Sequence, residues 1–122
     1  MTKYLYEDLS EKIIGCFYNV FNELGFGFLE SVYENALMIE LNKININAIR
    51  QQPIEVLYKG QIVGDFRADI IVDNKIIIEL KAVSKLSSIH EVQLVNYLKA
   101  TEIKIGLLVN FGEKLEFRRR IF

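Results

Sequence analysis

Cysteine and proline each occur only once in the 122-residue chain, and both shortages narrow the possibilities. The single cysteine, Cys16, excludes an internal disulfide framework and a zinc site made of several cysteines. Cys16 lies in an apolar run with helical spacing, so we expect it to be buried and unreactive. The sequence contains no linker rich in Pro, Gly or Ser and no repeat. We therefore expect one domain that spans residues 1–122.

Long apolar runs and an excess of positive charge are also missing. Without an apolar leader segment or a long uncharged apolar stretch, we expect a cytoplasmic protein with no membrane partner. The net charge is −1, so binding of nucleic acid would depend on a local basic patch. The dense basic cluster is Arg118-Arg119-Arg120, which is more typical of a solvated C-terminal tail than of a phosphate clamp.

Apolar residues at helical spacing predict two helices in the first third of the chain. The first runs from about Glu7 to Leu24 and ends at Gly25, a residue type favoured just after a helix. The second follows a glycine-rich entry and runs to about Asn42. Glu30 lies in its first turn, where the helix dipole favours an acid, and this is a sufficient structural reason for Glu30 without catalysis.

The rest of the chain predicts five strands and one more helix. Strands are expected at about 46–58, 62–72, 76–83, 103–111 and 114–122, with a helix at 88–100. Pro53 confines the first strand to a sheet edge or an irregular start, and Ser88 with Glu91 has the pattern of a capping box. The helix between two strands of one sheet makes a crossover. The predicted fold is therefore α/β, a central mixed sheet flanked by helices in the order ααβββαββ.

The strongest chemical pattern lies in the stretch DFRADIIVDNKIIIELK, residues 65–81. Its charged residues alternate with apolar ones on both sides of a turn, so they share one face of a hairpin. A three-residue turn would place Asp69 opposite Glu79 and Arg67 opposite Lys81. A two-residue turn would place Asp69 opposite Ile78 instead, and the sequence leaves this register open.

Two carboxylates at that spacing repel each other unless a proton or a cation lies between them. Oxygen ligands suit a hard divalent ion such as Mg2+, which also keeps waters and binds phosphate oxygens. Lys81, on the same face, could orient an attacking water or offset charge on a phosphate. The pattern indicates metal-assisted hydrolysis of a phosphodiester. The competing interpretation is a hairpin whose solvent face carries ordinary cross-strand ion pairs.

The predicted helix at 88–100 also has a polar face. His90, Gln93 and Tyr97 are three and four residues apart and therefore lie on one side of the helix. Leu94 and Leu98 lie beside them, and we expect both to pack on the sheet. The Gln93 amide needs hydrogen-bond partners among these packed residues. A lone histidine at a helix start, such as His90, is more typical of a structural or exposed position than of a functional one.

Four short motifs follow one another between about Leu24 and Phe111. They are Gly27-x-x-Glu30-x-x-Tyr33, Arg67-Ala68-Asp69, Glu79-Leu80-Lys81 and Gln93-x-x-x-Tyr97. Together, and in this order, they resemble the PD-(D/E)XK nuclease superfamily. The Q-x-x-x-Y string resembles its RecB-like branch, and the first string resembles the small GxxExxY proteins of bacteria and archaea that belong to the same group.

The resemblance implies a restriction-endonuclease-like core and a nuclease that depends on Mg2+ or Mn2+ and acts on nucleic acid, in the first place DNA. It implies that Asp69, Glu79 and the Leu80 carbonyl hold the metal and that Lys81 orients the attacking water. The catalytic residues it implies are Glu30, Asp69, Glu79, Lys81 and Gln93. The residues it implies at the substrate are Tyr33, Arg67, His90 and Tyr97.

Two other functions stay open on the sequence. Because the superfamily contains members that bind without cutting, the chain could be a module that binds nucleic acid or supports assembly. A purely structural subunit could use the edge strand near Pro53 for pairing. The short chain leaves little room for a recognition module, so sequence specificity would have to come from a homodimer or a partner protein.

Overall fold

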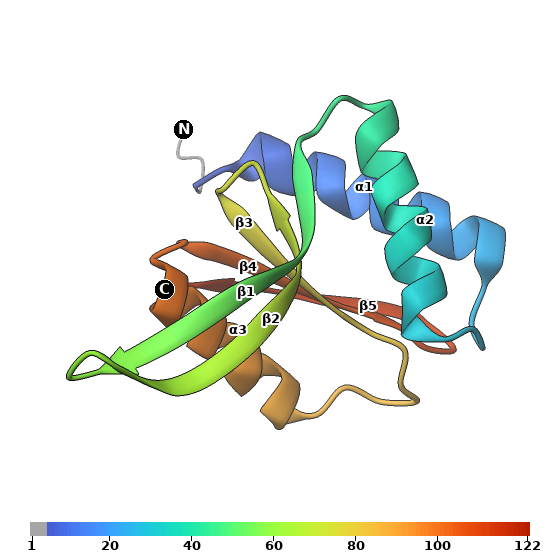
Figure 1. Cartoon of the computed structure of the whole chain (residues 1–122). Helices are drawn as coiled ribbons and strands as arrows, with labels where there is room; N and C mark the ends of the chain where they lie inside the picture. The colour runs from blue at the N-terminus through green and yellow to red at the C-terminus, as the bar shows by residue number, and fades with distance from the viewer. Residues whose placement is uncertain (1–4) are drawn as a thin grey trace.

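A computed structural model describes residues 5–122 of the chain. Its elements are α1 (Glu7–Leu24), α2 (Glu30–Lys43), β1 (Ala48–Tyr58), β2 (Gln61–Val72), β3 (Ile76–Lys81), α3 (Ser88–Thr101), β4 (Ile105–Phe111) and β5 (Leu115–Ile121) (Figure 1). Both the order ααβββαββ and the approximate bounds agree with the sequence prediction. No helix among the described residues is long and apolar enough to cross a membrane.

The five strands form one mixed sheet in the order β1-β2-β3-β4-β5. Neighbouring strands are antiparallel except β3 and β4, which are parallel. A parallel pair needs a crossover connection, and α3 provides it. Pro53 lies in β1, an edge strand, as its missing N–H requires.

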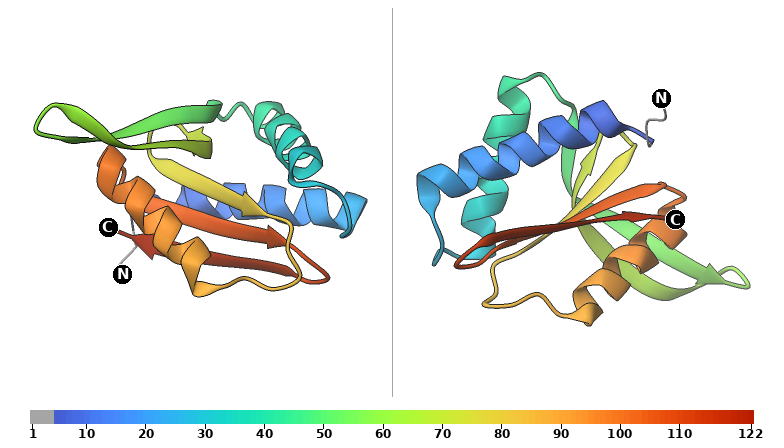
Figure 2. Two further views of the ribbon diagram at one scale, coloured as in Figure 1. Left: turned by 60° about the horizontal axis from the view of Figure 1, so that its bottom comes forward. Right: turned by 180° about the vertical axis from the view of Figure 1, so that it is seen from behind.

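Helices cover both faces of the sheet (Figure 2). One apolar cluster joins α1 and α2 to the sheet, and its largest buried side chains include Phe17, Tyr33 and Phe111. A second, smaller cluster joins α3 to the opposite face, where Leu94 and Leu98 are fully buried. The prediction that these two leucines pack on the sheet is therefore confirmed. Cys16 is also buried, as predicted, and burial raises the pKa of its thiol to about 11.

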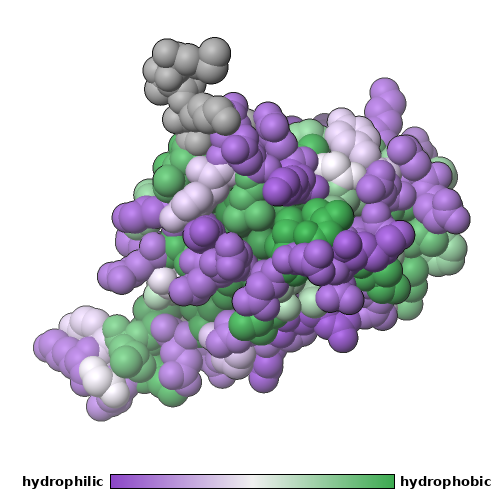
Figure 3. Space-filling model, turned by 90° about the horizontal axis from the view of Figure 1, so that it is seen from above, coloured by the Kyte–Doolittle hydropathy of each residue, from purple (hydrophilic) through white to green (hydrophobic). Residues whose placement is uncertain are grey.

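The hairpin of β1 and β2 extends beyond the rest of the sheet as an arm (Figures 1 and 2). Its turn is the dipeptide Lys59-Gly60, both at positive φ, as a tight hairpin turn requires. The outer part of the arm carries exposed apolar side chains among its polar ones (Figure 3); the exposed apolar residues are Leu57, Tyr58, Ile62 and Val63.

The turn between β2 and β3 has three residues, so Val72 pairs with Ile76 and Ile70 with Ile78. This settles the register that the sequence left open. The ladder ends at Ile70, however, because β2 continues into the arm beside β1. The β2–β3 ladder does not reach Arg67, so the expectation that Arg67 pairs with Lys81 is wrong; the partner of Arg67 is Pro53 of β1.

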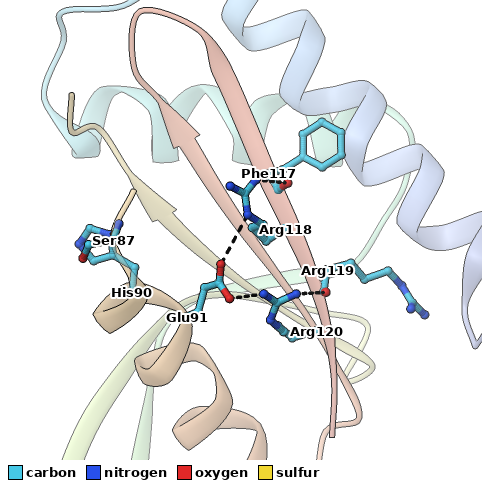
Figure 4. Close-up of polar contacts among 7 residues, drawn as sticks. All are labelled: Ser87, His90, Glu91, Phe117, Arg118, Arg119 and Arg120. Carbon is cyan, nitrogen blue, oxygen red and sulfur yellow. Dashed lines mark hydrogen bonds and ion pairs between the residues drawn. The ribbon is translucent and has the colours of Figure 1, made fainter. Parts of the chain in front are cut away.

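The structure corrects two predictions, one about the start of α3 and one about the basic cluster at residues 118–120. The residue that caps α3 is Ser87 and not Ser88, and His90 occupies the third helical position. Glu91 is therefore not part of the capping box, and it forms ion pairs with Arg118 and Arg120 instead (Figure 4). These arginines lie in β5 and not in a solvated tail. Their ion pairs with Glu91 of α3 hold them to the body of the protein.

Candidate active site

Asp69 and Glu79 lie together at the point where β2 and β3 separate. The Asp69 N–H donates to Glu79 Oε1 at 3.2 Å, and the Leu80 N–H donates to Asp69 Oδ2 at 2.8 Å. These two bonds take over from the backbone ladder, which ends at the preceding pair of residues. Each carboxylate is therefore fixed by a main-chain donor of the neighbouring strand. The three-residue turn thus brings the two acids together, as that register predicts.

Burial makes the negative charge of this pair costly. Glu79 is only 3% exposed, and its desolvation, followed by the nearby charge of Asp69, raises its pKa to about 8. Desolvation also raises the pKa of Asp69. The Lys81 charge acts in the opposite direction and lowers the pKa of both carboxyls. The site therefore favours a proton or a cation beside the two acids.

Lys81 ends β3 two residues after Glu79, so the two side chains project from the same face of the strand. The chain after Lys81 is clamped by buried Asn110 of β4, whose Oδ1 accepts from Val83 N and whose Nδ2 donates to Val83 O, both at 2.9 Å. At Gly112 an added Cβ would lie 2.8 Å from the same Val83 carbonyl. Asn110 and Gly112 were not singled out from the sequence, since no local pattern marks a clamp between distant segments.

Helix α2 brings two further acids to the site. Glu30, the first residue of α2, raises the pKa of Glu79 and of Glu34 through its charge. Glu34 is half-buried, and its own desolvation is the main cause of its raised pKa, with the Asp69 charge adding to it. Glu30 is thus near the carboxylate pair, as the prediction requires, although its side chain is exposed.

The loop that positions Glu30 depends on Tyr33. The Tyr33 hydroxyl donates to Gly25 O at 2.7 Å and accepts from Phe28 N at 3.3 Å, and its ring stacks on Phe111 at a centroid distance of 4.5 Å. The side chain is fully buried. The expectation that Tyr33 contacts substrate is therefore corrected: Tyr33 fixes the loop between α1 and α2 from inside the core.

Tyr97 of α3, which forms a hydrogen bond with Gln93 of the same helix, lies near the two carboxylates. Desolvation and then the charges of Glu79 and Asp69 raise the pKa of Tyr97 to about 12, while a hydrogen bond from Gln93 lowers it. Tyr97 is 4% exposed, and its ring lies 5.6 Å from that of Phe66 on β2. The structure therefore brings Tyr97 next to the two acids, and Gln93 is joined to it by a hydrogen bond.

Two other predicted residues have structural partners elsewhere. His90 Nδ1 accepts from the Ser87 N–H at 3.2 Å, so the imidazole belongs to the start of α3 (Figure 4). This is the structural position that a lone histidine at a helix start indicates. Arg67 is exposed, and its guanidinium donates to the Gln51 carbonyl of β1 at 3.0 Å. A substrate role for either residue stays a prediction.

Gln51 of β1 was missed from the sequence. Its Nε2 donates to Glu34 Oε1 at 2.8 Å and lies 3.5 Å from Asp69 Oδ1. The signal that could have found it is register: once β1 and β2 pair around Pro53 and Arg67, Gln51 falls opposite Asp69. Nothing else in the sequence distinguishes Gln51 from the other polar residues of this exposed strand.

The side chains at the site suit a hard divalent ion that is bound by few protein ligands and keeps several waters. Among residues 5–122, no three His, Cys, Asp or Glu side chains form a group that could hold a metal ion. Asp69 and Glu79 supply two carboxylates, and Mg2+ in proteins is usually bound by one or two carboxylates together with waters and substrate phosphates. The raised pKa of Glu79, caused first by desolvation and then by the Asp69 charge, shows that a negative charge there needs a compensating proton or cation.

A mixed five-stranded sheet with helices on both faces, and with its acids where β2 and β3 separate, defines a restriction-endonuclease-like fold. The chain belongs to the PD-(D/E)XK nuclease superfamily, whose family model matches residues 7–120. Nucleases of this superfamily generally use divalent metal ions, and their substrates are nucleic acids.

The structure is also similar to the crystal structure of SSO0001, with a TM-score of 0.59 and 25% sequence identity. The match covers 95% of this chain and 59% of that one, so this chain spans about three fifths of SSO0001. No curated protein matches the sequence.

Proposed function

We propose that this protein hydrolyses phosphodiester bonds of nucleic acid, in the first place DNA, with Mg2+ or Mn2+ as cofactor. The observation that carries the proposal is the Asp69–Glu79 pair, buried, held by reciprocal main-chain hydrogen bonds and followed by Lys81 on the same strand face. Membership of the nuclease superfamily supports it. The G-x-x-E-x-x-Y string further supports assignment to the GxxExxY proteins of the RecB-like branch.

In this proposal the ion is held by the oxygens that the main-chain donors leave over. Oδ2 of Asp69 and Oε1 of Glu79 accept backbone N–H bonds, so these two carboxylates, together with the Leu80 carbonyl, would hold the ion with oxygens that still have lone pairs free. A bound divalent ion lowers the pKa of its water and offsets charge on the phosphate.

The remaining residues act around this centre. Lys81 donates to the attacking water or to a phosphate oxygen and supplies positive charge as negative charge builds up on the phosphate. Glu30 acts from the start of α2 through a water. Gln93 and Tyr97 border the substrate backbone, with the Tyr97 hydroxyl protonated and able to donate because its pKa is about 12. This machinery belongs to one domain that spans the chain.

The test is a cleavage assay on single-stranded, duplex and branched DNA and on RNA, with Mg2+, with Mn2+ and with EDTA. Asp69→Ala and Lys81→Ala should each remove metal-dependent cleavage and leave the fold intact by circular dichroism. We expect losses of at least about 100-fold, the scale of removing one group that stabilises the transition state. Asp65→Ala and Lys85→Ala, which change exposed residues of the same types, serve as matched controls and should cleave like wild type.

Wild-type cleavage by Asp69→Ala or Lys81→Ala would contradict the assigned roles. Cleavage that survives in EDTA would contradict the dependence on metal. Binding of nucleic acid without cleavage under every metal condition would replace hydrolysis by a binding function on the same fold.

A further inference from the structure

Gln51 has an unusual backbone for a residue inside a strand. Its neighbours pair normally with β2, Arg50 with Ile70 and Gln52 with Ala68, which leaves Gln51 opposite Asp69. Gln51 itself has φ 52°. This left-handed conformation costs a residue with a Cβ on the order of 1 kcal/mol or more, and such strain persists only where the surroundings enforce it.

Two contacts enforce the conformation of Gln51. Its side-chain amide donates to Glu34 Oε1 at 2.8 Å, which ties β1 to α2. Its carbonyl accepts from the Arg67 guanidinium at 3.0 Å, which ties β1 to the next strand. Glu34 is half-buried and also lies 3.9 Å from Arg50, so the acceptor for the amide is itself held in position.

The result is an amide directed at one particular oxygen of the site. Gln51 Nε2 lies 3.5 Å from Asp69 Oδ1, while the Leu80 N–H holds the other oxygen, Oδ2, at 2.8 Å. The two oxygens of Asp69 therefore have donors on opposite sides. The amide and the Leu80 N–H together limit rotation of the carboxylate, and because the contact to Oδ1 is long, this oxygen keeps lone pairs for a ligand.

We propose that Gln51, held by Glu34, is a positioning residue that fixes Asp69 Oδ1 in the orientation needed to share one divalent ion with Glu79. This inference rests on the proposed metal-dependent function. Glu34 acts here as a hydrogen-bond acceptor for Gln51 and not as a ligand or as a required charge. Partners that orient metal-binding side chains typically contribute 10- to 100-fold to metal affinity.

The experiment is titration of the full chain with Mn2+ alone, followed by calorimetry and by electron paramagnetic resonance. Gln51→Gly accepts the left-handed backbone and removes only the amide, and it should weaken Mn2+ binding about 10-fold. Glu34→Ala should do the same, whereas Glu34→Gln keeps an acceptor oxygen for the amide and should bind like wild type. Gln52→Ala, next to Gln51 on the same exposed strand, is the matched control and should also bind like wild type.

Thermal unfolding of each variant without metal separates positioning from folding, and we expect midpoints close to that of wild type. Wild-type Mn2+ affinity in Gln51→Gly would overturn the positioning role and leave the proposed function standing. Equal weakening in Glu34→Gln and Glu34→Ala would also overturn it, because the Glu34 charge would then be what matters. A wild-type chain that does not bind Mn2+ would overturn the proposed function and this inference together.

Discussion

At the scale of single residues, the site is a balance between burial and charge. Glu79 is nearly inaccessible to solvent, yet it lies beside a second acid, and neither burial nor Asp69 favours its ionised form. The main-chain donor from Asp69 and the charge of Lys81 offset only part of this cost. This unfavourable environment for a charge is what the proposed metal ion would relieve.

The burial of Glu79 makes stability depend on pH in a definite direction. The pKa of Glu79 is 4.5 in the unfolded chain and about 8 in the folded protein. Between these values the folded state binds more protons, so the free energy of unfolding should fall as pH rises from about 5 to about 8. The raised pKa of Asp69 acts in the same direction. Urea denaturation in EDTA at pH 5 and pH 8 measures the difference.

Glu79→Gln provides the control for this pH dependence. The amide cannot ionise, so the variant should be more stable than wild type at pH 8 and should show a flatter profile. Mn2+ should restore stability to wild type at pH 8 and should not do so for the variant. Wild-type stability that rises between pH 5 and pH 8 in EDTA would contradict the account of Glu79.

Reasoning from single residues in the sequence identified the two acids and the lysine, but not the residues of other elements that hold them in position. Asp69, Glu79 and Lys81 could be predicted because strand alternation puts them on one face, where two carboxylates and a lysine indicate a metal site. Gln51 and Asn110 were not visible, because their partners come from other elements. Tyr33 was assigned to substrate because its motif suggested it, whereas its hydrogen bonds bury it under the α1–α2 loop.

At the scale of elements, the close approach of α3 to β4 holds Gln93 and Tyr97 against the sheet. Gly106 of β4 makes this approach possible: an added Cβ would lie 2.7 Å from Leu94 Cδ1 and 2.8 Å from Leu94 Cγ. Leu94 is fully buried and has no room to move away. Glycine at this position is therefore needed for packing.

Replacing Gly106 by alanine should lower the free energy of unfolding by about 1–3 kcal/mol, the usual cost of overpacking a core. The same substitution at Gly15, in the middle of α1, should have the opposite sign. Nothing lies within 4 Å of a Cβ there, and alanine should gain up to about 1 kcal/mol from helix propensity. Denaturant unfolding of the two variants measures both effects. Equal stability of Gly106→Ala and wild type would contradict the packing argument.

Most elements were predictable because their hydrophobic periods are long and regular. The order of elements, the α3 crossover and the edge position of β1 all follow from periodicity and from Pro53. The errors lie where tertiary contacts decide. Glu91 looked like a capping residue because it follows Ser88 by three, but Arg118 and Arg120 bind it from β5. The β2–β3 ladder stops early because β2 twists away with β1 into the arm, which no local pattern indicates.

At the scale of the whole molecule, the sheet is continuous except where β2 and β3 separate beyond Ile70 and Ile78. The strands β3 and β4 are buried on both faces, while β2 leaves β3 after three paired residues. The backbone N–H groups of Asp69 and Leu80 donate instead to the carboxylates of Glu79 and Asp69. Helix α2 on one face and α3 on the other complete the surroundings of the two acids. The account therefore predicts that one ion binds where β2 and β3 separate and is shared by Asp69 and Glu79.

Anomalous diffraction from crystals of the wild-type chain grown with Mn2+ tests this central claim most directly. We predict one strong anomalous peak within coordination distance of both Asp69 and Glu79, and its loss in crystals of Asp69→Ala. A fully occupied Mn2+ elsewhere, with the two carboxylates unchanged and no peak between them, would contradict the account.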